Sequence, residues 1–380
     1  MRSAFVVLSF LALFIIAESR VVLPLRHHSS KNVRSKPSKL TSPQSVIDYF
    51  DDFYSVSIML GTPPQKLIVR LDTSSSNLWI MDKNSCTAQQ CLGFPSLTSN
   101  FNRTLFNSTA SNTYTLKNTN FTTPDALCLT GVLGNDKLMI SGFGAISQDF
   151  GLCSVVDKYM GLHPFDGFLG LAWPALAIDG AIPIVQNQIA AGHFDQPVFS
   201  LYYGTSGVML SNDGQITWGG IDTTNCDSNI QYVPLSSKTY WQFTFNSFTF
   251  GSFSINKSQQ VISSSGDAVF VVPSNVLSTI VTILNATHEV FDDDGQWALP
   301  CNMSSTFPDL VYTINGQVYR IKGSDYIEPE DNHNTCALRI EDGGMGGFGP
   351  QWVLGVQFIR NYCHHYDVGN ARIGFSKPLH

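Results

Sequence analysis

The stretch LDTSSSNLWI, Leu71 to Ile80, determines how the rest of the chain is interpreted. Hydrophobic residues precede Asp72, with Arg70 facing the other way, so we expect a strand that delivers Asp72 into a turn. The chain then returns to a second hydrophobic strand, which carries Trp79. An aspartate capped by its own turn is the simpler alternative to a reactive carboxylate at this position. Small hydroxyl side chains that can hydrogen-bond the carboxylate and hold it ionised follow it: Thr73, Ser74, Ser75 and Ser76.

Length and charge limit the possible classes of protein. The chain has 380 residues, enough for two domains with separate cores, and only 13% of its residues are charged. Residues 1–44 contain seven of the 22 Lys and Arg residues and one of the 29 acidic residues. The remainder holds 15 basic and 28 acidic residues, a net charge of −13. An acidic body behind a basic N-terminal segment argues against a nucleic acid as partner.

Residues 1–19 have the pattern of a secretory signal peptide. Arg2 precedes an apolar run from Ala4 to Ala17 that is too short to span a bilayer. No later apolar run approaches the length of a membrane helix, so we expect a protein of the secretory pathway, extracellular or lysosomal, without stable membrane insertion. Eight cysteines fit that oxidising compartment. Six sequons are candidate glycosylation sites: Asn102, Asn107, Asn120, Asn256, Asn285 and Asn302.

The pattern after residue 45 is that of an all-β protein. Short alternating runs are separated by Gly, Pro and Asn, as strands and turns require. Only residues 184–191 and 274–284 have the pattern of helices. The second half also repeats the first, because FDGFLGLAW (165–173) and WVLGVQF (352–358) share a hydrophobic-hydrophobic-glycine element. A second loop equivalent to the one at Asp72 is therefore expected upstream of the later element, where VISSSGDAVFVVP (261–273) stands.

These loops, with ITWGGID (216–222), YVPL (232–235) and DVGNARIGF (367–375), resemble the pepsin-like aspartic proteases. The resemblance covers nearly all of residues 45–380. It implies a bilobal acid-protease fold with a peptide-binding cleft between an N-terminal lobe, 45–225, and a C-terminal lobe, 226–380. The basic residues 20–44 resemble a short prosegment, although a disordered basic tail is the alternative.

The resemblance also assigns the site residues. Asp72 matches the first catalytic aspartate of the family, and Ser74 stands where the family has glycine. In the second loop Gly266 matches the family's glycine, which places Ser264 at the position of the second catalytic aspartate and Asp267 three residues beyond it. The loop and wall residues expected to contact a substrate are Thr73, Ser74, Ser75, Trp79, Ser265 and Gly266.

Hydrolysis in this family requires two carboxylates that share a proton, one acting as base towards water and the other as acid. With Ser264 in place of the second carboxylate, we predict a catalytically deficient protein that binds a peptide or protein ligand in its cleft. The alternative is an active acid endopeptidase in which Asp267 supplies the second carboxylate to Asp72. The flap that closes over the substrate in the family also differs, because residues 124–127 lack its tyrosine.

We expect a monomer without cofactor or metal. His364 and His365 are adjacent on a predicted strand, so they point to opposite faces and cannot both bind one metal ion. Two disulfides match pairs in the family, Cys86–Cys91 and Cys301–Cys336. The other four cysteines permit three connectivities, of which Cys128–Cys153 with Cys226–Cys363 is preferred.

Overall fold

The computed structural model describes residues 39–49, 51–94, 103–205, 211–291, 294–329, 334–343 and 350–380. The expected signal peptide, most of the basic segment and Asn102 lie outside these residues. Within them, strands form five sheets, which confirms the all-β prediction. No helix in the described part of the chain is long and apolar enough to cross a membrane.

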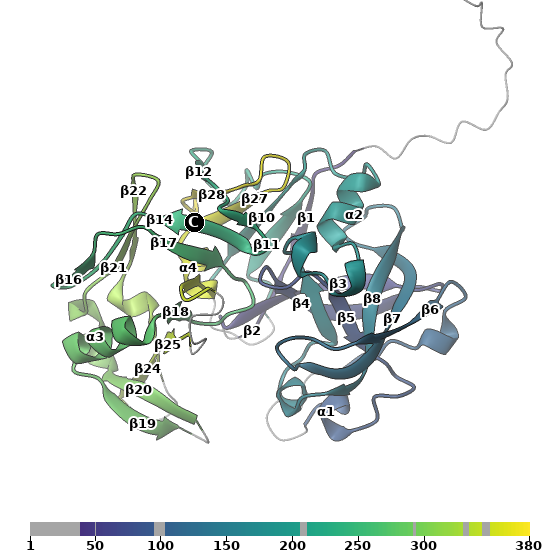
Figure 1. Cartoon of the computed structure of the whole chain (residues 1–380), viewed down its shortest axis with the longest axis horizontal. Coiled ribbons are helices and arrows are strands. Elements are labelled where there is room, and N and C mark those ends of the chain that lie inside the picture. Colours follow the sequence, from purple (N-terminus) through teal and green to yellow (C-terminus); the bar gives the residue numbers. More distant parts are fainter. Residues whose placement is uncertain are drawn as a thin grey trace, which may run out of the picture. The chain divides into compact units, whose positions relative to one another are not determined.

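An eight-stranded sheet in the N-terminal lobe carries the first loop (Figure 1). Strand β4 (Gln65–Asp72) ends in Asp72 and runs parallel to β9 (Gly167–Gly170), with Asp72 opposite Gly170. Alternate residues of β4 are fully buried, so packing determines the register that places Asp72 at the strand end. The other strands are β2 (Ile47–Tyr49), β3 (Phe53–Leu60), β5 (Leu78–Met81), β8 (Ile146–Val156), β7 (Cys128–Met139) and β6 (Thr115–Phe121).

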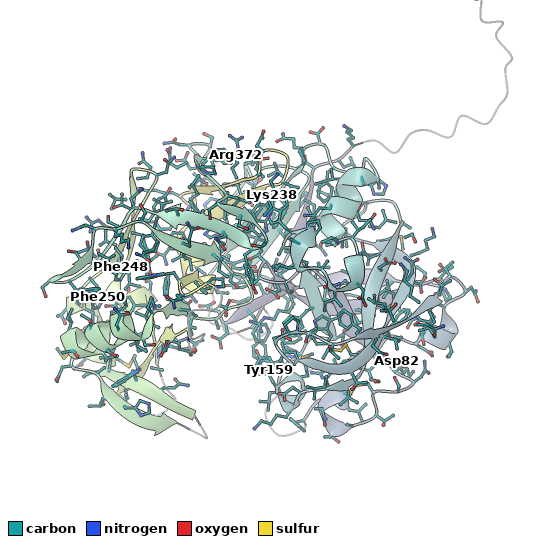
Figure 2. The ribbon with its side chains drawn as sticks, viewed as in Figure 1. Asp82, Tyr159, Lys238, Phe248, Phe250 and Arg372 are labelled. Carbon is teal, nitrogen blue, oxygen red and sulfur yellow. A yellow bond between two sulfur atoms is a disulfide. The ribbon has the colours of Figure 1, made fainter. Side chains whose placement is uncertain are left out.

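The C-terminal lobe repeats this arrangement. Strand β17 (Gln259–Ser263) ends directly before Ser264 and runs parallel to β26 (Val353–Leu354). Figure 2 shows Phe248 and Phe250 among the side chains of this lobe, where both are fully buried. The remaining strands are β13 (Ser237–Lys238), β14 (Trp241–Phe245), β18 (Phe270–Val272), β25 (Ile340–Asp342), β16 (Phe253–Ile255), β15 (Ser247–Phe250), β21 (Leu310–Ile314), β22 (Gln317–Ile321), β19 (Thr287–Phe291), β20 (Asp294–Pro300), β24 (Thr335–Leu338) and β23 (Ile327–Pro329).

A six-stranded sheet joins the two lobes, since it takes strands from both halves of the chain. Its core is aromatic: the rings of Phe199 and Tyr366 are stacked with centroids 4.5 Å apart, and Trp241 contacts Tyr366 edge-on at 4.9 Å. The basic segment predicted to end at residue 44 overlaps the first strand of this sheet. In spatial order the strands are β1 (Ser42–Ser45), β11 (Gly214–Trp218), β10 (Val198–Tyr203), β27 (Cys363–Asp367), β28 (Arg372–Ser376) and β12 (Gln231–Pro234).

The two adjacent histidines lie on β27 and are both fully buried. His365 is hydrogen-bonded on both ring nitrogens, to Ser200 Oγ and Ser376 Oγ at 2.9 Å each. Burial lowers the pKa of His365 to about 4. These contacts make the histidines interior groups of the sheet.

Two predicted helices are confirmed, and two were missed. Helices α2 (Ile184–Ala190) and α3 (Ser274–Leu284) lie within the predicted ranges. Helices α1 (Gln89–Leu92) and α4 (Val356–Asn361) were not expected. The first four residues of α4 are all buried, so its sequence lacks the polar face by which an amphipathic helix is recognised. The prediction of only two helices was therefore wrong.

Four disulfides connect all eight cysteines: Cys86–Cys91, Cys128–Cys153, Cys226–Cys363 and Cys301–Cys336. The first closes a loop beside β5, whereas Cys226 and Cys363 are 137 residues apart. The third therefore ties the start of the C-terminal lobe to the sheet that joins the lobes.

The two extreme loop lengths predict different losses of stability. Replacing Cys226 and Cys363 by serine should lower the free energy of unfolding by about 5 kcal/mol. The disulfide closes a long loop in the unfolded wild-type chain, and its loss gives the unfolded state more conformational entropy. Replacing Cys86 and Cys91 should cost only about 2 kcal/mol. Urea unfolding under oxidising conditions measures both variants against wild type. Equal losses would contradict the loop-length explanation.

Candidate functional site

The two loops meet through reciprocal hydrogen bonds between Thr73 and Ser265. Thr73 Oγ1 donates to the carbonyl oxygen of Ser263 at 2.9 Å and accepts from the Ser265 N–H at 2.9 Å. Ser265 Oγ donates to the carbonyl oxygen of Leu71 at 3.0 Å and accepts from the Thr73 N–H at 3.0 Å. Each hydroxyl thus makes the same two bonds to the opposite loop. Thr73 and Ser265 are equivalent residues of two related halves.

It follows that the residues directly before them, Asp72 and Ser264, are also equivalent. The strand register supports this: Asp72 lies opposite Gly170, and the Ser264 N–H donates to the carbonyl oxygen of Leu354, the residue before Gly355, at 3.0 Å. Ser264 is fully buried, and its hydroxyl accepts from the Gly266 N–H at 3.2 Å. A neutral hydroxyl therefore occupies the place that a symmetric site would give to a second carboxylate.

Asp72 is 5% exposed and is held by the residue that departs from the family pattern in its own loop. Its Oδ1 accepts from both the Ser74 N–H, at 2.8 Å, and Ser74 Oγ, at 2.5 Å. A Cβ added to Gly266 would lie only 2.4 Å from Asp72 Oδ1. From the near-symmetry of the loops, we expect the Cβ of Ser74 to face the side chain at position 264 in the same way. A serine there leaves room for Ser74 that an aspartate would not.

Asp267 brings a second carboxylate into the same cavity, three residues beyond Ser264. Burial raises its pKa above the usual value, the side-chain hydrogen bond from Ser264 opposes that shift, and the charge of Asp72 adds to it. Its carbonyl oxygen accepts from the Val356 N–H at 2.9 Å, at the start of α4. The structure therefore brings Asp72, Ser264 and Asp267 together, with the carboxylates displaced from a symmetric arrangement.

Arg70 is a further site residue that sequence reasoning did not assign. Its side chain is 4% exposed, and its guanidinium lies over the ring of Phe53, 4.9 Å from the centroid. It donates to the carbonyl oxygen of Gly266 and, at 3.0 Å, to the hydroxyl of Tyr159, which lies on the N-terminal lobe (Figure 2). This cation ties β4 to the second loop and lowers the pKa of Asp267. Its only sequence signal was a charge inside an apolar strand.

A cavity of about 470 Å³ opens above the two loops. Of the predicted substrate-binding residues, Ser74, Ser75 and Trp79 line it. The other three, Thr73, Ser265 and Gly266, are not among the described residues that line it, and the first two are fully buried in the bonds between the loops.

The turn at the flap position forms one wall of this cavity through Thr123, Pro124 and Asp125. Asp125 Oδ1 accepts from the Thr123 hydroxyl and, at 3.0 Å, from the Leu127 N–H. Ala126 has a positive φ of 59°. A carboxylate-capped tight turn therefore stands where the family carries its tyrosine.

Comparisons with known proteins found similar sequences over most of the chain. Residues 53–378 match the family model described as eukaryotic aspartyl protease. Aspartic protease 1 of Caenorhabditis elegans is 41% identical over 346 residues, which cover 90% of this chain and 86% of the relative. Aspartic protease 17 of the same organism is 39% identical over 348 residues, with 90% and 86% coverage. Pepsin A of Suncus murinus is 34% identical over 357 residues, with 92% and 87% coverage.

The expected proximity of positions 74 and 264 predicts that a repair needs two changes. Ser264→Asp alone should lower the free energy of unfolding by about 1–3 kcal/mol, because the added carboxylate meets the Cβ of Ser74. Ser74→Gly with Ser264→Asp should recover most of that loss. A double-mutant cycle by urea unfolding measures the coupling, with Ser74→Gly alone as the control. Additive effects would show that the two side chains do not meet.

The raised pKa of Asp267 predicts a pH-dependent stability. The folded state binds this proton more tightly than the unfolded chain, so the contribution is fully present below the unfolded pKa of about 4. It is lost as the pH rises through the folded pKa. The free energy of unfolding of wild type should therefore fall relative to that of Asp267→Asn as the pH rises from about 4. Urea unfolding at several pH values tests this, and a constant difference would contradict it.

Proposed function

Because the chain belongs to the eukaryotic aspartyl protease family, we propose that it binds peptides in the cleft between its lobes and hydrolyses them far more slowly than a site with two symmetric carboxylates. The observation that carries the proposal is the equivalence of Ser264 with Asp72, given by the reciprocal bonds of Thr73 and Ser265. The cleft itself is built by core strands, so loss of one carboxylate leaves its walls intact.

The chemical reason lies in the proton that the two carboxylates of this family share. One group must take a proton from water while the other gives one to the carbonyl oxygen of the substrate. Ser264 can donate a hydrogen bond, but its hydroxyl is a very poor acid and cannot share a proton with Asp72. Loss of such an acid or base typically lowers a rate by about 10²–10⁴-fold.

A second candidate function is acid endopeptidase activity by Asp72 with Asp267. The observation that favours it is that both carboxylates line one cavity and that the charge of Asp72 raises the pKa of Asp267. A protonated Asp267 beside an ionised Asp72 would fill the roles of acid and base. Ser264, which hydrogen-bonds Asp267, would then position the displaced acid.

The secretory pathway is the compartment that the disulfides and the pepsin relatives support. Within it we propose an extracellular or lysosomal, monomeric glycoprotein. Four sequon asparagines of the described residues are exposed, and Asn107 is half-buried. The exposed ones are Asn120, Asn256, Asn285 and Asn302.

Cleavage of acid-denatured globin between pH 3 and 6 tests the proposal. Wild type should cleave at least 100-fold more slowly than pepsin A at equal concentration, and Asp267→Asn should change that background little. A peptide inhibitor that places a hydroxyl at the reacting carbon should bind about 100-fold more weakly than it binds pepsin A, since it meets one symmetric carboxylate rather than two.

The variants also identify the second candidate function. Cleavage at a rate comparable with pepsin A, abolished by Asp72→Asn and by Asp267→Asn alike, would overturn the proposal and establish that pair as catalytic. Asp195→Asn, which changes an exposed carboxylate outside the cavity, is the matched control.

A further inference from the structure

The hydroxyl of Ser74 lies directly on the carboxylate of Asp72. Ser74 Oγ donates to Asp72 Oδ1 at 2.5 Å, and the Ser74 N–H donates to the same oxygen at 2.8 Å. Both residues line the cavity above the two loops. A hydroxyl within hydrogen-bond reach of a base is the arrangement that activates a serine as a nucleophile. The carboxylate of Asp72 therefore has a hydroxyl of the protein itself beside it.

This hydroxyl lies where the two loops meet. A Cβ added to Gly266 would lie 3.2 Å from Ser74 Oγ and 2.4 Å from Asp72 Oδ1. Because Gly266 has no side chain, the space beside both oxygen atoms stays open. The family pattern has glycine at the position of Ser74 and so has no hydroxyl there. Ser74 thus adds a reactive group that hydrolysis by two carboxylates and a water does not use.

The neighbouring serines of the first loop are held differently. Ser76 Oγ donates to the carbonyl oxygen of Trp173 at 2.6 Å. Ser75 Oγ is buried and has no hydrogen-bond partner among the described residues, although Ser75 as a whole is half-buried and lines the cavity. A serine side chain turns about one bond, so Ser75 can direct this unused donor towards an oxygen atom in the cavity. An unsatisfied donor therefore follows the serine that lies on the base.

The wall of the cavity indicates which acyl groups fit beside these residues. Apolar side chains from both lobes line it, among them Leu176, Ile178, Ile262 and Val353. Burial against such a wall favours apolar side chains of a ligand. The acyl donors that fit are therefore esters and amides of apolar peptides.

We propose that Ser74 is a nucleophile activated by Asp72, and that the cleft transfers acyl groups to Ser74 Oγ from esters of apolar peptides and, more slowly, from peptide bonds. The inference rests on the proposed function, to which it adds the nucleophile of the slow reaction.

The transfer has two steps. In the first, Ser74 Oγ forms a bond to the acyl carbon, the bond from that carbon to the leaving oxygen or nitrogen breaks, and the hydroxyl proton passes through Asp72 to the leaving group. In the second, water forms a bond to the acyl carbon, the bond to Ser74 Oγ breaks, and a proton of that water passes through Asp72 to Ser74. Ser75 donates to the oxyanion that develops in both steps. A carboxylate is a weaker base than histidine, so both steps are slow.

A chromogenic ester tests the proposal on the folded protein. Acetyl-Leu-Phe p-nitrophenyl ester is mixed with the protein at about pH 6, nitrophenol release is followed, and acid-quenched samples are mapped by mass spectrometry. Wild type should release about one nitrophenol per protein molecule in a burst, and the acyl group should lie on the fragment that contains Ser74. Nitrophenolate leaves without needing a proton, so the burst reports the attack by the nucleophile.

Three variants identify the groups involved. Ser74→Gly should remove both the burst and the adduct, while its affinity for the peptide amide acetyl-Leu-Phe-Leu-Ala, measured by calorimetry, should stay within about 2-fold of wild type. Asp72→Asn keeps the hydroxyl and removes the base, so the burst should be about 100-fold slower. The matched control is Ser254→Gly, at an exposed serine of β16, which should leave the burst unchanged.

Two results would overturn the role of Ser74 and leave the proposed function standing. One is a wild type that binds the peptide amide and gives neither burst nor adduct, as expected if the hydroxyl only caps the carboxylate of Asp72. The other is a burst that Ser74→Gly retains. Failure of wild type both to bind the peptide amide and to react with the ester would overturn the proposed function together with this inference.

Discussion

The reciprocal hydrogen bonds of Thr73 and Ser265 are the interaction on which the site depends. They are fully buried, and they join two loops that are 192 residues apart in sequence. Loss of either hydroxyl would leave backbone groups of the opposite loop without partners in the interior, which costs more than a single exposed bond. Because these bonds fix the two loops relative to each other, they also fix the positions of Asp72 and Ser264, which directly precede the two hydroxyl residues.

The replacement at position 264 changes both electrostatics and packing. Two carboxylates held against each other cannot both ionise cheaply, and that conflict is what poises a symmetric site for acid catalysis. Ser264 removes the conflict at its own position. Part of this conflict between carboxylates remains at Asp267, because the charge of Asp72 still raises the pKa of Asp267.

The residues around the two loops add charge of both signs to the site. Arg70 fixes the second loop from behind and places a cation near Asp267, whereas Asp125 and Asp342 add negative charge at the walls. Positive charge thus lies in the interior, and negative charge lines the cavity.

The sequence by itself determined the fold class, because alternating strands, the two related loops and the repeated glycine elements are local patterns. It also identified the candidate residues Asp72, Ser264 and Asp267, since the loop motifs align without knowledge of contacts. Helix α4 escaped prediction because its first four residues are all buried and show no polar face. Only the tertiary structure decided which carboxylates share a cavity, that Arg70 reaches Gly266 and that Asp72 and Ser74 lie against Gly266. These are contacts between residues far apart in the chain, and their distances depend on how the two lobes pack.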